Sequence, residues 1–392
     1  MNIIIYEDKN LDCLKPLTLN HSPLELRVGA FTNFERIVKI FNPDDQFIII
    51  VRKNIEDLIK SKFPRCNVNP NIVPEGLCLN SSAIFLETNL DLIKKNQNLS
   101  SNKQLVSFHL KKKIASENFY DLVNDKSVIT VESNIKVINN IWDIFKLPQE
   151  ILDDDFKNFL FTNNYNWHHS LIKINEERVY IGDNCSLKAG VILDASNGPI
   201  IIDNNTIIDH HVSIKGPVYI GKDGYISAGS RIKENTIIGP VCKIGGEISH
   251  CNFLGYSNKV HDGFLGHSYI GEWVNIGAGT NNSNLKNNYG NIRILIGKKE
   301  YDTKQQFLGT LIADYTRIAI GTTINTGSYF SIGSNIFNHE FNCKYMPAFS
   351  WGINERVVFN KFIDSISKMK SRRKEKIIPA EMNFLENLYN DI

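Results

Sequence analysis

Aliphatic residues recur at every sixth position in the second half of the chain. Isoleucine occupies eight consecutive positions at this spacing, namely 202, 208, 214, 220, 226, 232, 238 and 244. Ile181, Leu187 and Leu193 precede this series, and Phe264, Ile270 and Ile276 follow it. A period of six fits neither an α-helix nor a simply alternating strand. It predicts a triangular left-handed parallel β-helix, with every sixth side chain on the axis and Gly, Asn or Asp at the corners.

The alternative is a β-sandwich in which isoleucine happens to be regularly spaced, and eight consecutive matches fit it poorly. The period is interrupted at residues 194–201, after Ile244, and in the long polar stretch between Ile276 and Ile320. Such interruptions are where loops can build a site on a rigid rod.

The first half of the chain has a different pattern. Short apolar runs at residues 2–6, 46–51, 82–87 and 127–133 alternate with segments of helical spacing such as 55–63. This alternation predicts a doubly wound α/β domain. We therefore expect an α/β domain at 1–160, a linking helix near 151–175, the β-helix at 175–354 and a C-terminal helical segment at 355–392.

Composition narrows the class of protein. The net charge of +2 and the 22% of charged residues favour neither nucleic acid nor a membrane surface as a partner. No apolar run is long enough for a membrane span, and the N-terminus reads as a strand instead of a signal peptide. The seven scattered cysteines form no CxxC pair, which argues against a zinc site and favours a reducing compartment such as the cytoplasm.

One segment carries a specific resemblance. Residues 257–284, SNKVHDGFLGHSYIGEWVNIGAGTNNSN, resemble the acetyltransferase signature of the bifunctional N-acetylglucosamine-1-phosphate uridylyltransferase/glucosamine-1-phosphate acetyltransferase family. The N-terminal loop PLTLNHSPLELRVG resembles a divergent subgroup of that family which lacks the glycine-rich form. The match is specific over about fifty residues of the second half.

The resemblance implies acetyl transfer from acetyl-CoA to an amino-sugar phosphate, in nucleotide-sugar biosynthesis for the cell envelope, by a cytoplasmic homotrimer. It implies His261 as general base and Asn275 at the reacting centre. It implies further contacts to the substrate from Arg231, Glu247 and Asn284 and to the CoA chain from Ala278 and Thr310. The chain departs from the family at Ser249 and Phe264, and Lys259 is a candidate to replace the lost charge.

For the first domain the resemblance implies nucleotidylyl transfer with Mg²⁺. The candidates are Asp8, Lys15 and Arg27, in or near the first loop. Arg27 could pair with a phosphate or form a surface ion pair. No metal-binding aspartate is recognisable, since LNSSAIF offers only Asn80, and both the G-x-G-x-x-G and the P-loop patterns are absent.

The chemistry of acetyl transfer requires a base near neutral pH, which suits histidine. It also requires donors for the developing oxyanion, and the N–H groups of Gly277, Ala278 and Gly279 are candidates. His267 is a rival base. The basic run at 371–376 could touch an anionic ligand or be a solvated helix face. Two other functions stay open: a nucleotidylyltransferase with a structural β-helix, and a non-catalytic nucleotide-sugar-binding scaffold.

Overall fold

The computed structural model describes all residues except 10, 43, 96, 126–128, 158–164, 166–167 and 338–342. The chain divides into two compact units. The N-terminal unit comprises Met1–Leu26, Phe31–Ile141 and Ile378–Leu388, and the β-helix unit comprises Arg27–Ala30, Trp142–Ile377 and Tyr389–Ile392. Of the expected linking segment, α5 (Pro148–Lys157) is helical, and much of the remainder lies outside the described residues.

The N-terminal unit contains a seven-stranded mixed sheet in the order β12-β9-β10-β7-β1-β4-β5. The central strand β1 (Asn2–Tyr6) pairs in parallel with β4 (Gln46–Ile50) and with β7 (Gly76–Asn80). The order therefore runs outward from β1 in both directions, and the doubly wound prediction is confirmed. The other strands of this sheet are β5 (Asn67–Val68), β9 (Leu99–Ser101), β10 (Gln104–Leu110) and β12 (Val131–Glu132).

Short elements complete this unit. The α-helices are α1 (Asn33–Ile40), α2 (Glu56–Lys62), α3 (Leu90–Ile93) and α4 (Ser116–Val123). Its short strands are β3 (Phe31–Thr32), β6 (Ile72–Val73), β8 (Ala83–Ile84), β11 (Ile114–Ala115) and β13 (Lys136–Val137), whereas β2 (Arg27–Val28) belongs to the β-helix unit.

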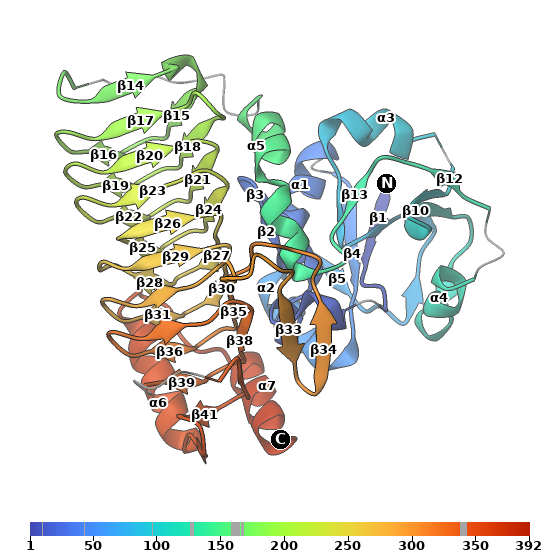
Figure 1. The fold of residues 1–392 in the computed structure, drawn as a ribbon. Coiled ribbons are helices and arrows are strands. Elements are labelled where there is room, and N and C mark those ends of the chain that lie inside the picture. Colours follow the sequence, from blue (N-terminus) through green and yellow to red (C-terminus); the bar gives the residue numbers. More distant parts are fainter. Residues whose placement is uncertain are drawn as a thin grey trace. The chain divides into compact units, whose positions relative to one another are not determined.

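The second unit is the predicted left-handed parallel β-helix, with three parallel sheets that form its faces (Figure 1). The first face contains β14 (Ile172–Ile174), β17 (Ile192–Asp194), β20 (Ser213–Lys215), β23 (Arg231–Ile232), β26 (Glu247–Ser249) and β29 (Phe264–Gly266). The second face contains β15 (Val179–Ile181), β18 (Ile200–Ile202), β21 (Val218–Ile220), β24 (Thr236–Ile238), β27 (Asn252–Gly255), β30 (Tyr269–Glu272), β35 (Thr310–Ile312), β38 (Ser328–Phe330) and β40 (Tyr345–Met346).

The third face carries the site described below. It contains β16 (Ser186–Leu187), β19 (Ile207–Ile208), β22 (Tyr225–Ile226), β25 (Lys243–Ile244), β28 (Asn258–Lys259), β31 (Asn275–Ile276), β36 (Arg317–Ile318), β39 (Asn335–Ile336) and β41 (Ser350–Trp351), and β42 (Glu355–Arg356) adds an antiparallel edge.

The isoleucine series forms the axial core. All eight residues from 202 to 244 are at most 1% exposed, because each points from its strand into the interior of the rod. The prediction fails at Phe264, which is partly exposed, while its neighbour Leu265 takes the axial position opposite Ile248. The reason is that the axial steps from Ile244 to Ile248 and on to Phe253 are shorter than six residues. The period therefore resumes in a different register.

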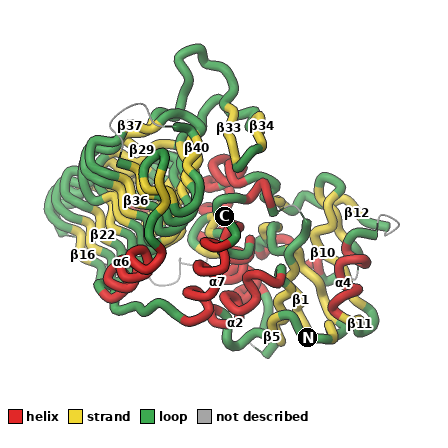
Figure 2. Tube along the Cα trace, turned by 90° about the horizontal axis from the view of Figure 1, so that it is seen from below, coloured by secondary structure: helices red, strands yellow, loops and turns green. Residues whose placement is uncertain are grey.

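The long polar stretch contains an added strand and a hairpin. The hairpin strands β33 (Arg293–Ile296) and β34 (Lys299–Asp302) are antiparallel, and they project from the stacked coils (Figure 2). β32 (Asn281–Asn282) pairs with β37 (Thr323–Ile324), so the coil resumes beyond the insertion.

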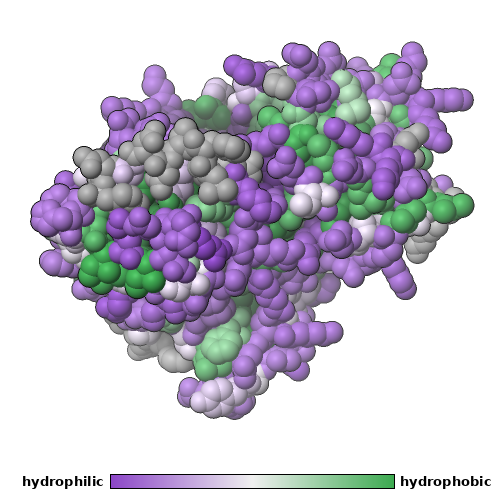
Figure 3. Space-filling view, turned by 90° about the horizontal axis from the view of Figure 1, so that it is seen from above, coloured by the Kyte–Doolittle hydropathy of each residue, from purple (hydrophilic) through white to green (hydrophobic). Residues whose placement is uncertain are grey.

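The C-terminal segment is helical as predicted, with α6 (Phe359–Ser371) and α7 (Pro379–Asn390). Phe362 anchors α6 to the β-helix through ring contacts with Phe349 and Tyr315. Among the described residues, no helix is long and apolar enough to cross a membrane. The view in Figure 3 shows a mostly hydrophilic surface with scattered apolar areas, and the exposed aliphatic side chains include Ile172 and Ile174 of β14.

Candidate functional site

His261 lies at the corner between the third and first faces, which we call the site corner. Ala278 and Ile320 occupy the same corner in the next two coils, after β31 and β36 respectively. Two backbone hydrogen bonds join these coils: Gly279 N donates to Asp262 O at 2.9 Å, and Gly321 N donates to Ala278 O at 2.7 Å. His261 is exposed there, and its imidazole forms no hydrogen bond with any described residue.

Glycine is required two residues after His261. Gly263 has φ +123°, and a Cβ at this position would overlap the carbonyl oxygen of Thr280 in the next coil. The chain can turn this corner closely only without a side chain. The tight stacking fixes the backbone that presents His261.

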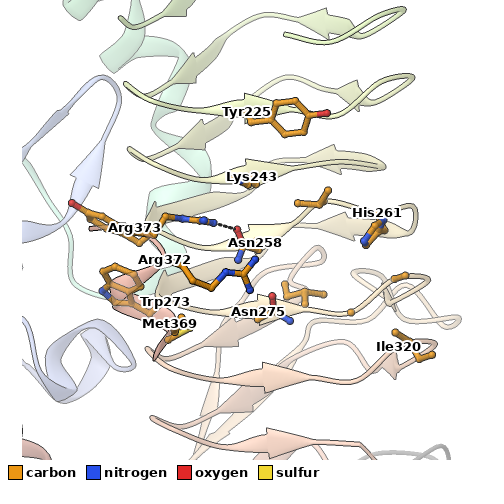
Figure 4. Close-up of a pocket in the computed structure, with 15 residues that line it drawn as sticks. Tyr225, Lys243, Asn258, His261, Trp273, Asn275, Ile320, Met369, Arg372 and Arg373 are labelled. Atoms are coloured by element: carbon orange, nitrogen blue, oxygen red, sulfur yellow. Dashed lines mark hydrogen bonds between the residues drawn. The ribbon is translucent and has the colours of Figure 1, made fainter. Parts of the chain in front are cut away.

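A cavity of about 600 Å³ opens on the third face and reaches the site corner (Figure 4). It contains the predicted His261, Asn275 and Ala278. The cavity is lined by Tyr225, Lys243, Tyr256, Asn258, Val260, His261, Trp273, Asn275, Ile276, Gly277, Ala278, Ile320, Met369, Arg372 and Arg373. Sequence reasoning missed Lys243, although Lys243, Asn258 and Asn275 form one outward column through strand pairing. A search at the coil length of about 18 residues from Tyr225 would have found Lys243.

The first face carries a charged cluster of Arg231, Lys233 and Glu247. Glu247 accepts from Arg231 Nη2 at 2.9 Å and from Lys233 Nζ at 2.6 Å. These hydrogen bonds, that from Lys233 foremost, lower the pKa of the Glu247 carboxyl. The structure thus brings together the predicted Arg231 and Glu247. It adds Lys233, which follows Arg231 by two residues, the spacing of side chains on one side of a strand.

Asn284 and His267 lie near the other edge of the first face. Asn284 Nδ2 is 2.9 Å from His267 Nδ1, and the His267 ring stacks on His250 with centroids 4.3 Å apart. Burial, aided by the neighbouring His250, lowers the pKa of His267 to about 3. His267 is thus neutral at physiological pH and does not line the cavity. The rival base therefore does not share the site corner with His261.

The prediction that Lys259 binds substrate is wrong. Lys259 occupies an axial position opposite Ile244 and is 0% exposed. Its ammonium donates to the carbonyl oxygens of His261 at 2.7 Å, Asp262 at 3.2 Å and Gly245 at 3.4 Å. Lys259 therefore stabilises the turn at His261 from inside the β-helix and does not contact a ligand.

The burial of Lys259 predicts a pH-dependent stability. Desolvation lowers its pKa to about 8, below an unfolded value of about 10.4. Between these pH values the unfolded state holds more protons, so the wild type gains stability as pH rises. We expect Lys259→Met to lack this gain, which is at most about 3 kcal/mol. Urea unfolding of both proteins at pH 7.5 and pH 10 measures the difference, and parallel pH profiles would contradict the assignment.

Thr310 is also misplaced by the prediction. It is 0% exposed on the second face, where its hydroxyl donates to Ser328 O at 3.2 Å. The polar insertion lengthens the coil that follows Ala278. The residue at the site corner of the next coil is therefore Ile320. Ile320, which was not among the predicted site residues, lines the cavity, and Thr310 does not.

Only part of the predicted oxyanion site is free. Gly277 N donates to Ile318 O, and Gly279 N donates to Asp262 O, each at 2.9 Å. These two N–H groups therefore belong to the hydrogen bonds between coils. Among the described residues the N–H of Ala278 has no such partner, and it remains the candidate donor.

The N-terminal unit has its own cavity of about 1030 Å³, at the carboxyl end of β1. Asp8 lines it together with Lys9, Lys103 and Gln104. The Asp8 carboxylate accepts hydrogen bonds from the side-chain amides of Asn80, at 2.9 Å, and Gln104. Amide donors already hold this carboxylate, and Asp8 belongs to no cluster of three metal-ligating side chains in the described ranges. The donor set does not fit Mg²⁺.

Two predicted nucleotide-binding residues lie elsewhere. Arg27 is 6% exposed in the β-helix unit, where it lies over the Tyr219 ring at 5.6 Å and donates to Ala30 O. Arg27 is thus a packing residue instead of a phosphate ligand. Lys15 pairs with Asp12 at 2.8 Å and does not line the cavity of the N-terminal unit.

Comparisons with known proteins support the predicted relationship. The profile of a family described as sugar nucleotidyl transferase matches residues 3–162. The bifunctional protein GlmU of Baumannia cicadellinicola is 30% identical over 184 residues, 44% of this chain and 34% of that protein. A bifunctional sugar-1-phosphate nucleotidylyltransferase/acetyltransferase of Sulfurisphaera tokodaii is 25% identical over 294 residues, 74% of this chain and 63% of that protein.

Among solved structures, the UDP-N-acetylglucosamine acyltransferase from Campylobacter jejuni aligns with 18% identity and a TM-score of 0.26, over 40% of this chain and 66% of that one. The matches span about a third of the length of the GlmU relatives. The resemblance predicted from the sequence is confirmed: residues 3–162 match the sugar nucleotidyl transferase family, and the chain is similar over part of its length to bifunctional sugar-1-phosphate nucleotidylyltransferase/acetyltransferases.

Proposed function

We propose that the β-helix unit transfers an acetyl group from acetyl-CoA to the amino group of an amino-sugar phosphate. The observation that carries this proposal is the position of His261 at the edge between a cavity and a charged face. The cavity on the third face contains Ala278, and the first face presents Arg231 and Lys233. A donor and an acceptor on adjacent faces would meet at this corner.

The proposed reaction uses few groups. His261 removes a proton from the acceptor ammonium, and the amine nitrogen then attacks the thioester carbonyl. The N–H of Ala278 donates to the oxyanion of the tetrahedral intermediate. The carbon–sulfur bond breaks, and the leaving thiolate takes a proton to give free CoA. Holding both substrates at one corner supplies the entropic part of the catalysis.

The acceptor would bind on the first face. Arg231 and Lys233 flank Glu247, and a sugar phosphate could pair with these cations while Glu247 accepts from a sugar hydroxyl. Phe264 is in register with Glu247 and offers an apolar surface to the sugar ring. We propose a homotrimer, by resemblance to the family, in which a neighbouring copy completes the acceptor site.

The test is a thiol-release assay with the full chain. Protein supplied with acetyl-CoA and glucosamine-1-phosphate is expected to release free CoA, and omission of the amino sugar should abolish the release. A panel of other amino-sugar phosphates identifies the preferred acceptor. Folded protein that releases no CoA with any of them would reject the proposal.

A second candidate function is nucleotidylyl transfer by the N-terminal unit. The family match over residues 3–162 and the cavity beside Asp8, Lys9 and Lys103 favour it. The absence of the glycine-rich loop and the poor fit to Mg²⁺ weigh against turnover. Release of pyrophosphate from UTP or dTTP with a hexose-1-phosphate would establish it, whereas binding without release would favour the scaffold alternative.

A further inference from the structure

Three cationic side chains face the cavity beside His261. Lys243 comes from β25, and Arg372 and Arg373 follow directly after α6. Among the described residues, no Asp or Glu lines this cavity, and none of the three cations forms an ion pair. The cavity is therefore a concentrated positive site, since uncompensated cations attract an anion.

The local environment makes this cluster costly without an anion. Arg373 Nη2 donates to Asn258 Oδ1 at 2.8 Å, while its Nε is buried with no hydrogen-bond partner in the described part of the chain. Burial and the two neighbouring guanidinium groups lower the pKa of Lys243, and burial together with Arg372 lowers that of Arg373. A nearby acid, Glu375, is engaged by the Tyr256 hydroxyl at 3.5 Å. An anion in the cavity would offset the repulsion.

The cationic side chains and the site corner lie at different ends of the cavity. In Figure 4, Arg372 and Arg373 lie on one side and His261 on the other, with Asn275 between them. Ala278 and Ile320 line the end near His261. A ligand that fits this arrangement carries phosphates at one end and an uncharged reactive group at the other.

We propose that Lys243, Arg372 and Arg373 form a phosphate-binding subsite that holds the phosphorylated nucleotide end of the acyl donor. This inference rests on the proposed acetyl transfer, because it takes His261 as the point to which the thioester extends. Within the basic run at 371–376, Arg372 and Arg373 are thus assigned to ligand binding, whereas Lys376 lies outside the cavity. The phosphate of the acceptor is the competing source of the same chemistry, and the first face already offers Arg231 and Lys233 to it.

The test is calorimetric titration of the full chain with CoA, dephospho-CoA, pantetheine and glucosamine-1-phosphate. The double variant Arg372→Gln/Arg373→Gln is expected to bind CoA roughly 10- to 100-fold more weakly, because charge-assisted hydrogen bonds are lost. The separate variant Lys243→Gln should also bind CoA more weakly than the wild type. Lys376→Gln is the matched control, since this exposed lysine lies outside the cavity and should leave CoA binding unchanged.

The ligand series distinguishes the outcomes. Loss of affinity that shrinks from CoA to dephospho-CoA and vanishes for pantetheine would establish the subsite and its phosphate contacts. Unchanged CoA affinity in the variants, no CoA binding by the wild type, or a selective loss for glucosamine-1-phosphate would each overturn it. CoA binding that depends on the arginines, in protein without acetyl transfer, would reject the proposed reaction and leave the subsite standing.

Discussion

Replacement of His261 by alanine is expected to lower the rate of acetyl transfer by a factor of about 10² or more. The imidazole lies at the site corner with no hydrogen bond to a described residue, so its loss removes the base and disturbs little packing. Binding of CoA should persist, because the cationic side of the cavity is untouched. Steady-state kinetics of thiol release and calorimetric titration with CoA measure the two effects.

The matched control for this variant is His210→Ala. His210 lies at the same type of corner after β19, is exposed, and does not line the cavity. Its replacement should leave the rate unchanged. Partial recovery of His261→Ala activity by imidazole added to the buffer would show that the variant is folded and lacks only the base. Equal rates for wild type and His261→Ala would remove His261 from the mechanism.

The axial period predicts the fold because it records the physical requirement of a triangular rod. Each face must place one apolar side chain on the axis, and the isoleucines from 202 to 244 satisfy this in every strand. The period cannot predict where a coil shortens. Leu265 replaces Phe264 at the axial position for that reason. Lys259 can occupy an axial position because three backbone carbonyl oxygens accept hydrogen bonds from its ammonium group.

The candidate site was predictable only where it follows the local motif. His261, Asn275 and Ala278 lie in one continuous segment, and the structure places all three on one cavity. Thr310 is buried on the second face, beyond a hairpin that lengthens its coil, and the sequence does not show on which face the chain resumes after such an insertion. Arg372 and Arg373 are distant in the sequence, and only the packing of α6 brings them beside Lys243.

Arg27 illustrates a different limit. A loop after the first strand of a doubly wound sheet is the usual place for a phosphate ligand, which made Arg27 a reasonable candidate. The structure instead buries it against Tyr219, where Asn252 donates to its backbone carbonyl at 2.8 Å. Residue type and loop position do not reveal such packing, because the contact joins residues almost two hundred positions apart.

Replacement of Ile208 by aspartate is expected to prevent folding of the β-helix unit. Ile208 is 0% exposed and is in register with Leu187 and Ile226 of the adjacent coils. A carboxylate there would have no partner in an apolar column, and its cost of several kcal/mol is comparable to the 5–15 kcal/mol that stabilises a typical protein. Circular dichroism, thermal melting and size-exclusion chromatography should show loss of the native β signal and aggregation.

The neighbouring residue supplies the control for this variant. Ile207 lies on the same strand but points outward and is 41% exposed, so Ile207→Asp should change the stability by no more than about 0.5 kcal/mol. The milder variant Ile208→Ala should cost about 2–5 kcal/mol through lost burial and the cavity it leaves. Each coil is stabilised by its contacts with the adjacent coils. Disruption of one axial position therefore also destabilises its neighbours. Similar melting temperatures for Ile207→Asp and Ile208→Asp would contradict the axial assignment on which the position of His261 depends.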